Sequence, residues 1–292
     1  VFRLCDRITV LRDGSFVGTY DRGTTAPADI VRAMVGRELP ERPERGAAAL
    51  GAPVLTVSGL TRRPCFRDVS LEVKAGETVA LFGLVGSGRS ELLETIFGLY
   101  TPDAGEISVA GRPVRIRSPR AAARAGIALV PEERQRQGLF FNLSIRHNLV
   151  LPERTARGDI IVRPAAERKK AAELISQLHI KAAGVEVPPD SLSGGNQQKI
   201  MVARWLATSP RVLLLDEPTK GVDVGAKFEI HEIIRRQAAA GLACLVVSSD
   251  LPEVLALADR IIVMRAGHVQ GDLPGAGATE EAVMHLATAE AA

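Results

Sequence analysis

The chain has 292 residues, of which 46% are hydrophobic and 24% charged, a composition typical of a soluble globular protein with one large or two ordinary domains. Lysine and arginine together (37) nearly balance aspartate and glutamate (34), so the net charge of +3 argues against a nucleic-acid-binding surface. Apolar runs such as "LACLVVS" (242–248) have the length of a strand rather than of a membrane span. The three widely separated cysteines fit neither a disulfide framework nor a zinc site and are interpreted as reduced thiols.

The first residues of the chain recur near its end. "VFRLCDRITVLRDG" (1–14) and "VLALADRIIVMRAG" (254–267) are identical at 8 of 14 positions. A repeat of this quality predicts that one structural unit ends twice in the chain, the alternative being two unrelated pieces in which a helix leads into a strand. We therefore expect the tail of a first unit, a linker and the whole of a second unit, in a protein that extends further upstream.

A proline- and glycine-rich stretch with alternating charge, "GRELPERPERGAAALGAP" (36–53), predicts the linker. After it, "VLTVSGL" and "DVSLEV" predict an antiparallel pair of strands. "ETVALFG" predicts an apolar strand that leads into a glycine-rich loop, and "RSELLETIFGLY" predicts the helix that follows. Further short strands are predicted at "RPVRI" and "GIALVPE".

The second half of the chain alternates helices with strands. Helices are predicted at "LSIRHNLVL" and "PAAERKKAAELISQL", between about 143 and 182. They are followed by the strand "VLLLDEP", the helix "GAKFEIHEIIRRQAAAG", the strand "LACLVVS", the helix "LPEVLALA" and the strand "DRIIVM". This alternation predicts an α/β fold with a parallel core sheet covered by helices, and the helix-rich middle predicts a subdomain.

The loop "GLVGSGRS" (83–90) has the glycine spacing and the position of a phosphate-binding loop, between a strand and a helix. Gly83, Gly86 and Gly88 are expected to allow the tight backbone with positive φ that such a loop needs. Ser90 occupies the position of a hydroxyl that ligates Mg²⁺. Because Arg89 stands where the loop's lysine is expected, the loop alone is equally consistent with an ordinary glycine-rich turn.

Two later segments strengthen the phosphate-binding interpretation. "VLLLDEP" (212–218) ends in Asp216, which can hold Mg²⁺, and Glu217, which can orient or deprotonate a water, although an acidic turn after a strand is the alternative. "LSGGNQQK" (192–199) places a serine and two glycines before a helix, whose N-terminus attracts anions. The three segments in this order are far more specific than any one of them.

These motifs resemble those of ATP-binding cassette (ABC) ATPases. "LSGGNQQK" resembles the signature motif, and "DEPTKGVDVGAK" resembles the Walker B segment with the D-loop. "GLVGSGRSE", with its arginine, resembles the second cassette of the tandem ATPase subunits of bacterial carbohydrate importers. The resemblance implies a P-loop NTPase fold of ABC type, with a parallel core sheet, an antiparallel β subdomain and a helical subdomain at about 118–190. It also implies the tail of a first cassette at 1–36, a linker at 37–53 and a second cassette at 54–292.

In this family two cassettes face each other head to tail and hold two ATP molecules between them. Each ATP contacts the Walker motifs of one cassette and the signature of the other. The resemblance implies that one group of residues binds ATP and Mg²⁺ in this cassette: Gly83, Gly86, Ser87, Gly88, Arg89 and Ser90 at the nucleotide, Ser90, Asp216 and Glu132 around the metal, and Glu217 as the catalytic carboxylate. A second group would serve the other cassette's ATP in trans or lie at the interface: Ser193, Gly194, Gly195, Gln197 and Asp223.

The resemblance also implies partners and a location. The partners would be the first cassette of the same polypeptide, the integral-membrane permease subunits and, indirectly, a periplasmic sugar-binding protein, with no nucleic acid. The protein would be peripheral to the cytoplasmic face of the bacterial inner membrane. The sugar is not specified by this chain, because substrate choice in such importers resembles a property of the receptor and permease.

Several positions depart from the family pattern on one site. Arg89 is longer and planar, so it cannot occupy the place of the Walker lysine between phosphates. Ser249 stands at the position of the switch histidine, and Glu132 stands where the Q-loop glutamine is expected. The only nearby aromatic that could stack on adenine is Phe66, which is expected to belong to the core. We therefore expect a degenerate ATP site in this cassette and an intact signature that completes the first cassette's site.

Two other functions stay open at this point. One is a cytosolic tandem ABC protein that acts on ribosomes or nucleic acid, disfavoured by the short linker, the nearly neutral charge and the missing Walker lysine. The other is a regulatory module that binds nucleotide without turnover. Among the remaining features, the charge run "ERQRQ" (133–137) is interpreted as a solvated face, with permease contact as the alternative, and Trp205 as a core residue.

Overall fold

The structure is a computed structural model of the 292-residue chain. It describes Phe2 and residues 4–12, 15–26, 29–30, 33–34, 50–159 and 161–288. The predicted linker at 37–53 lies outside the described residues up to position 49, and strand β3 begins at Pro53. Among the described helices, none combines the length and the apolar content that crossing a bilayer requires.

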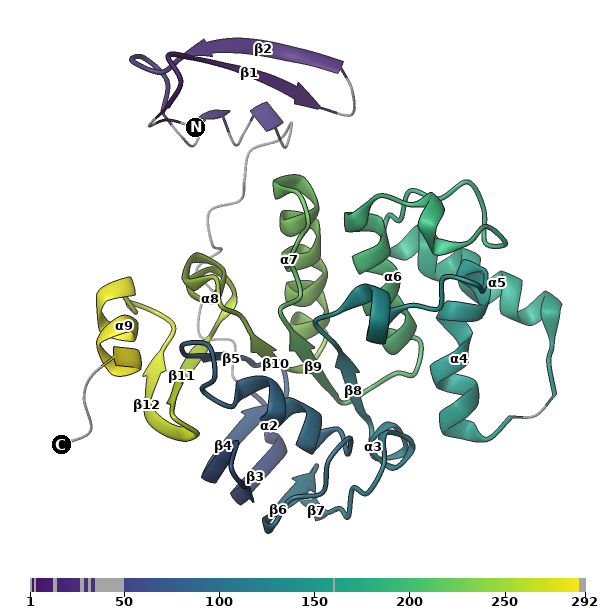
Figure 1. Cartoon of the computed structure of the whole chain (residues 1–292). Coiled ribbons are helices and arrows are strands. Elements are labelled where there is room, and N and C mark those ends of the chain that lie inside the picture. The colour runs from purple at the N-terminus through teal and green to yellow at the C-terminus, as the bar shows by residue number, and fades with distance from the viewer. Residues whose placement is uncertain are drawn as a thin grey trace.

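The centre of the fold is a six-stranded sheet with the order β12–β11–β5–β10–β9–β8 (Figure 1). Its strands are β5 (Thr78–Phe82), β8 (Ile127–Val130), β9 (Val212–Asp216), β10 (Ala243–Val247), β11 (Arg260–Arg265) and β12 (His268–Pro274). The pairs β8–β9, β9–β10, β10–β5 and β5–β11 are parallel, and only β12 runs antiparallel to its neighbour in this sheet. The predicted parallel core sheet is therefore confirmed.

A smaller antiparallel sheet packs beside the central one. Its strands are β3 (Pro53–Arg62), β4 (Phe66–Lys74), β6 (Ala104–Val109) and β7 (Arg112–Pro113), in the order β4–β3–β6–β7. The predicted antiparallel pair corresponds to β3 and β4. The strand expected at "RPVRI" is limited to the two residues of β7, an edge strand whose proline has no N–H to donate to the ladder.

The described helices, except those at 119–125 and 280–288, begin close to the positions that the sequence predicts. They are α2 (Arg89–Ile96), α3 (Pro119–Ala125), α4 (Ile145–Arg157), α5 (Pro164–Gln177), α6 (Gly194–Leu206), α7 (Val224–Ala239), α8 (Leu251–Leu257) and α9 (Glu280–Thr288). A π-helical turn covers Arg134–Gly138 and a 3₁₀ turn covers Pro189–Ser191. Side-chain oxygens of Ser118, Ser144 and Asp250 accept N-cap hydrogen bonds at the start of α3, α4 and α8, which is why these helices begin there.

The core lies on both faces of the central sheet, because successive residues of a strand point to opposite faces. In β9, Leu214 packs with α2 and the antiparallel sheet, whereas Leu213 and Leu215 pack with α6 and α7. In β10, Leu245 packs on the side of α2 and the antiparallel sheet, and Val246 packs on the side of α6 and α7. Figure 1 shows the resulting layers, with α2 and the small sheet on one side of the central sheet and α7 and α8 on the other.

The sequence repeat is also a structural repeat. Strands β1 (Arg7–Arg12) and β2 (Ser15–Asp21) form a hairpin that is paired like β11–β12. Arg7 lies opposite Asp21, as Arg260 lies opposite Pro274, and a register shift after Val10 matches the shift after the equivalent Val263. The buried residues that pack beside the first hairpin are Ile8, Val10 and Ile30. Each has a buried equivalent 253 residues later, at Ile261, Val263 and Val283.

Candidate functional site

The phosphate loop (residues 83–90) connects the buried strand β5 to helix α2. Gly86 and Gly88 have φ values of 82° and 90°, in the left-handed region that favours glycine. A Cβ on Gly88 would also lie 2.5 Å from the carbonyl oxygen of Cys65. Gly83 is also expected to have a positive φ, but it does not. A glycine is needed there because the backbone passes close to β11, and a Cβ would lie 2.2 Å from the carbonyl oxygen of Met264.

Two side chains of the phosphate loop show how it is held. Ser90 Oγ donates a hydrogen bond of 3.1 Å to Oδ1 of Asp216, which joins α2 to the end of β9. Ser87 is 4% exposed, and within the described part of the chain its Oγ has no hydrogen-bond partner. A buried hydroxyl without a partner is costly unless a ligand supplies one, and a phosphate oxygen is a suitable acceptor.

Arg89 points into the protein rather than along the loop surface. Its side chain is 8% exposed, and Nη1 donates a hydrogen bond of 2.9 Å to the carbonyl oxygen of Ser248, just beyond β10. Burial lowers the pKa of the guanidinium, and the nearby carboxylates of Glu217 and Asp216 oppose this shift. The arginine therefore places a buried positive charge at the carboxyl end of the sheet.

Asp216 and Glu217 follow β9 at that same end. Asp216 is buried, and this raises its pKa to about 7, although the hydrogen bond from Ser90 acts in the opposite direction. Glu217 adopts a left-handed backbone with a φ of 46°, which is uncommon for a residue with a side chain. Its Oε2 accepts a hydrogen bond of 3.1 Å from Ser249 Oγ, and burial raises its pKa. The residue at the switch position thus contacts the carboxylate assigned to catalysis.

Glu132 follows strand β8 and forms an ion pair with Lys220. Its negative charge contributes to the raised pKa values of Asp216 and Glu217. Among the described residues, no group of three or more His, Cys, Asp and Glu side chains is arranged to hold a metal ion by itself. A Mg²⁺ here would accordingly need oxygen ligands beyond Ser90 and Asp216, which suits a metal that usually retains waters and substrate phosphates.

The signature (residues 192–199) lies at the start of α6. Ser193 is the N-cap residue, and its Oγ accepts a hydrogen bond of 2.9 Å from Asn196 Nδ2. A Cβ on Gly195 would lie 2.3 Å from the Cβ of Ala226, so the first turn of α6 approaches α7 closely. Gln197 Nε2 donates to the carbonyl oxygens of Pro189 and Leu192. These bonds fix the signature to its own surroundings.

Asp223 caps α7, because its Oδ1 accepts a hydrogen bond of 2.9 Å from the N–H of Ala226. The sequence-predicted residues therefore form two groups in this cassette. One group gathers at the carboxyl end of the central sheet, where ligands of open α/β sheets bind: Gly83, Gly86, Ser87, Gly88, Arg89, Ser90, Glu132, Asp216, Glu217 and Ser249. The other group lies at the starts of α6 and α7: Ser193, Gly194, Gly195, Gln197 and Asp223.

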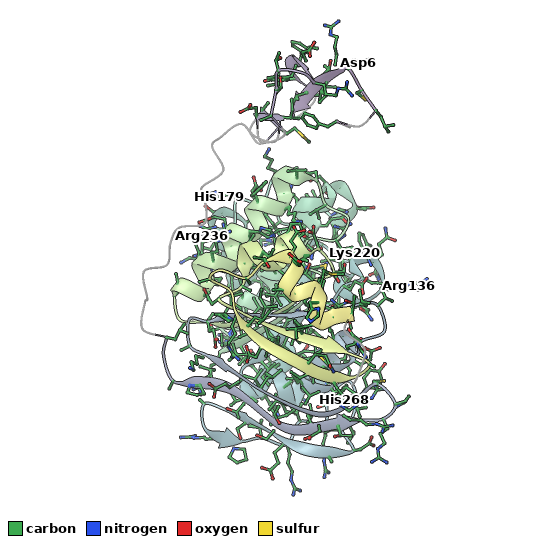
Figure 2. All side chains as sticks on the ribbon, turned by 90° about the vertical axis from the view of Figure 1, so that its left-hand side faces the viewer. Asp6, Arg136, His179, Lys220, Arg236 and His268 are labelled. Carbon is green, nitrogen blue, oxygen red and sulfur yellow. The ribbon has the colours of Figure 1, made fainter. Side chains whose placement is uncertain are left out.

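Sequence reasoning missed one residue that joins these segments. Arg134 belongs to the charge run interpreted as a solvated face, but its Nη1 donates to the carbonyl oxygen of Gly194 at 3.3 Å and its Nη2 to that of Gly221 at 3.2 Å. Arg136, two residues later, fits the interpretation, since its side chain is 83% exposed and projects from the surface (Figure 2). No signal in the run itself separates the two arginines.

The expectations for two aromatic residues can also be checked. Phe66 is completely buried in the core beside β3 and α2, which confirms that it belongs to the core. Trp205 is partly buried on α6 and packs edge to face on Phe97, with ring centroids 5.2 Å apart. Its expected role in packing is confirmed.

Comparisons with known proteins show which family the chain resembles. The sequence profile described as "ABC transporter" matches residues 66–220. The proteins named ribose import ATP-binding protein RbsA from Geobacillus kaustophilus and Rhodococcus jostii are 47% and 45% identical to this chain. Each match covers 99% of the chain but only 58% of the relative's own length.

Solved structures show the same fold. A nucleotide-free ATP-binding cassette from an ABC transporter has a TM-score of 0.68 at 22% identity, over 80% of this chain and 95% of the other. A dimeric ATP-binding cassette in a post-hydrolysis state, bound to ADP and Pi, has a TM-score of 0.66 at 24% identity, over 77% and 100% of the two chains. The α/β P-loop fold of ABC type that the sequence predicts is thereby confirmed.

Proposed function

The chain belongs to the ABC transporter family, and from this we propose that it holds the second ATP-binding cassette, with the tail of the first, of the subunit that energises carbohydrate import. Ribose, or a related monosaccharide, is the proposed solute, because the relatives matched over 99% of the chain are named for ribose import. The repeated hairpin β1–β2, paired in the register of β11–β12, supports the tandem arrangement. The same names do not favour a protein that acts on ribosomes or nucleic acid.

The phosphate loop of this cassette binds ATP in the proposal. Its backbone N–H groups, the orphaned hydroxyl of Ser87 and the charge of Arg89 suit the phosphates, while Ser90 and Asp216 suit Mg²⁺. Bound Mg²⁺ would neutralise charge that develops on the phosphates during hydrolysis. Glu217 is the carboxylate placed to orient a water.

Hydrolysis at this site is slow in the proposal. Arg89 is long and planar, so even when its guanidinium contacts a phosphate it cannot supply the compact charge that a lysine places between phosphates. Ser249 donates to Glu217 and has no charge to offer a γ-phosphate. Glu132 adds negative charge near Asp216 and Glu217 and, after burial, contributes to their raised pKa values. The site therefore combines features for holding nucleotide with few for stabilising the transition state.

The signature serves the other ATP, which is held by the Walker motifs of the first cassette. Ser193 and the N–H groups at the start of α6 form a donor set at a helix N-terminus, where negative charge is favoured. Asp223 and the turn before α7 lie at the interface of the two cassettes. The proposed partners are the first cassette, a membrane permease and, through it, a periplasmic sugar-binding protein, with the subunit at the cytoplasmic face of the inner membrane.

The experiment compares two substitutions in the tandem protein that contains this cassette. Ser193→Arg is expected to abolish most ATP hydrolysis, because a bulky cation prevents closure, and losing one preorganised donor costs on the order of 10²-fold. Glu217→Gln is expected to cost much less, since that carboxylate serves the slow site. Phosphate release measures both, with circular dichroism as the check on folding. If Glu217→Gln is the more damaging change, chemistry occurs at this cassette's own site and the proposal is wrong.

A further inference from the structure

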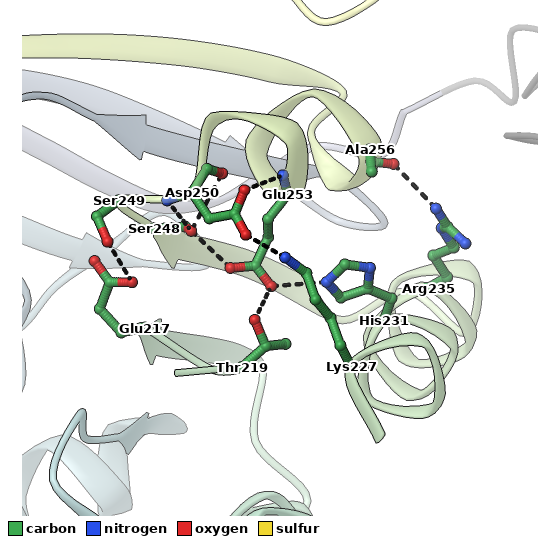
Figure 3. A network of polar contacts seen from close by, with 10 residues as sticks. All are labelled: Glu217, Thr219, Lys227, His231, Arg235, Ser248, Ser249, Asp250, Glu253 and Ala256. Carbon is green, nitrogen blue, oxygen red and sulfur yellow. Dashed lines mark hydrogen bonds and ion pairs between the residues drawn. The ribbon is translucent and has the colours of Figure 1, made fainter. Parts of the chain in front are cut away.

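A buried carboxylate that the proposed function does not use joins three elements near the nucleotide site (Figure 3). Glu253, in the first turn of α8, is 2% exposed. Its Oε2 accepts a hydrogen bond of 2.6 Å from Ser248 Oγ, and its Oε1 accepts one of 2.7 Å from Thr219 Oγ1. His231 Nε2 of α7 lies 2.7 Å from the same Oε1. One side chain thus connects the end of β10, the loop after β9 and helix α7.

The hydrogen bonds keep this carboxylate ionised. Burial by itself would raise the pKa of Glu253, but hydrogen bonds from His231, Ser248 and Thr219 more than offset this and hold the pKa below its usual value. A buried charge depends on its partners, because leaving it unsatisfied costs more than leaving a neutral group unsatisfied. The segments that carry these donors are therefore fixed relative to one another.

On one side, Glu253 holds the switch segment (residues 248–249), which contacts the nucleotide site directly. The carbonyl oxygen of Ser248 accepts the 2.9 Å hydrogen bond from Arg89, and Ser249 donates to Glu217. Phosphate is a stronger partner for a guanidinium than a neutral carbonyl is, since hydrogen bonds between two charged groups are shorter and stronger. A nucleotide in the phosphate loop would therefore draw Arg89 away from Ser248.

On the other side, Glu253 holds the D-loop turn (residues 217–223) through Thr219. The turn is closed by backbone hydrogen bonds from Lys220 to Glu217 (3.1 Å) and from Val222 to Thr219 (3.4 Å). At its tip the carbonyl oxygen of Gly221 accepts from Arg134, whose other terminal nitrogen donates to Gly194 in the signature. Contacts thus run without a gap from the phosphate loop to the signature.

We propose that Glu253 is a positioning residue that couples nucleotide binding at Arg89 to the conformation of the signature offered to the other cassette. The idea rests on the proposed binding of nucleotide in the phosphate loop and adds a role for that slow site. Without nucleotide, Arg89 bonds to Ser248, and Glu253 and Arg134 hold the D-loop turn and the signature in place. Nucleotide releases Arg89 from Ser248, the contacts around Glu253 loosen, and the first turn of α6 becomes mobile. The slow site then regulates the fast one.

Hydrogen–deuterium exchange of the 292-residue chain tests this coupling, with Mg²⁺ and a non-hydrolysable ATP analogue as the probe. In the unsubstituted chain the analogue is expected to speed exchange in peptides covering 194–200 about tenfold, within the usual range of coupling between sites. Glu253→Gln keeps the shape of the side chain but presents an amide to the donors around it. In this variant the peptides covering 194–200 are expected to exchange fast already without the analogue, and the analogue is expected to cause no further increase. Glu173→Gln makes the same chemical change at an exposed position and is expected to behave like the unsubstituted chain.

A second variant tests the far end of the connection and does not depend on the buried site. Arg134→Lys retains the charge but cannot bridge the carbonyls of Gly194 and Gly221 with two nitrogens. In this variant the analogue is expected to cause no change of exchange at 194–200, while the change of exchange at 217–223 and 248–253 is expected to remain. If Glu253→Gln does not fold, Ser248→Ala can replace it, because it removes one hydrogen-bond donor to Glu253. Ser248→Ala is expected to weaken the nucleotide-dependent change of exchange at 194–200 as well as that at 217–223 and 248–253.

Titration of the analogue by fluorescence separates the two proposals. Binding with no change of exchange at 194–200 in the unsubstituted chain overturns the coupling alone. The coupling is also wrong if Glu253→Gln and Arg134→Lys both retain the full response. No binding by the unsubstituted chain at any concentration overturns the nucleotide site itself, and the coupling with it.

Discussion

The buried carboxyl group of Asp216 makes the stability of the chain depend on pH, and Asp216→Asn is expected to remove that dependence. The side chain is 5% exposed at the end of β9. Burial, with the charges of Glu132 and Glu217 adding to it, raises the pKa from 3.8 to about 7, even though Ser90 donates a hydrogen bond to the carboxylate. The ionised form is therefore disfavoured in the folded chain when no metal is bound.

The sign follows from proton linkage. Because the folded pKa lies above the unfolded one, the folded chain retains a proton between about pH 4 and pH 7 that the unfolded chain has lost. The free energy of unfolding contributed by Asp216 accordingly falls as pH rises through this window. Each unit of pKa shift corresponds to about 1.4 kcal/mol, so the loss between pH 5 and pH 8 is about 3 kcal/mol.

Urea unfolding followed by circular dichroism at pH 5 and pH 8, in EDTA, measures this loss. Asparagine has nearly the same shape as aspartate and does not titrate. On going from pH 5 to pH 8, the free energy of unfolding of Asp216→Asn is therefore expected to rise by about 3 kcal/mol relative to that of the unsubstituted chain. Other titrating groups are common to both proteins and cancel. Asp190→Asn, an exposed aspartate, is the matched control and is expected to show no such gain. An equal difference at both pH values for Asp216→Asn would refute the reasoning.

Three further substitutions test the phosphate loop. Gly88→Ala is expected to destabilise the chain by several kcal/mol, because the new Cβ meets the carbonyl of Cys65. Gly86→Ala has open space around it and is expected to cost only about 1 kcal/mol for its positive φ. Equal losses of unfolding free energy in urea would contradict the packing argument. Arg89→Lys alone is expected not to restore ATP hydrolysis, because Ser249 remains at the switch position and Glu132 at the Q-loop position. Turnover of about 1 s⁻¹ by that single variant, at the low end of typical enzymes, would show that the arginine is the sole handicap.

The elements of the fold could be predicted because their signals are local. Apolar runs such as 212–215 and 243–247 have the length of buried parallel strands, and the expected helices have caps that the sequence displays, such as Ser144 and Asp250. The repeat predicted that one structural unit ends twice, and the structure forms at both ends a hairpin with the same register and the same bulge, a detail that the repeat did not predict. For the site, the glycine spacing and the acids after β9 predicted a set of residues that the structure brings together at the carboxyl end of the central sheet.

The contacts of charged side chains could not be predicted, because they depend on segments far apart in the chain. Arg134 and Arg136 stand in one charge run, yet one bridges two backbone carbonyls and the other is solvated. Glu253 follows an N-cap aspartate and, from sequence alone, could equally be an exposed acid in the first turn of a helix. Its burial is decided by Thr219 and His231, which reach it from elements that precede it by 34 and 22 residues.

The departures at Arg89 and Ser249 belong to one rearrangement rather than two independent losses. Arg89 is long enough to reach the carbonyl of Ser248, the residue before the switch position, so its charge stabilises the end of β10. Ser249 is short enough to donate to Glu217 from the same segment. A lysine at position 89 would leave that carbonyl without its present donor, and Ser249 would still hold the carboxylate. The two positions therefore need to change together, and Arg89→Lys with Ser249→His is expected to raise the rate of hydrolysis by more than the sum of the two single changes even while Glu132 remains, because the effects of residues that share a network are not additive.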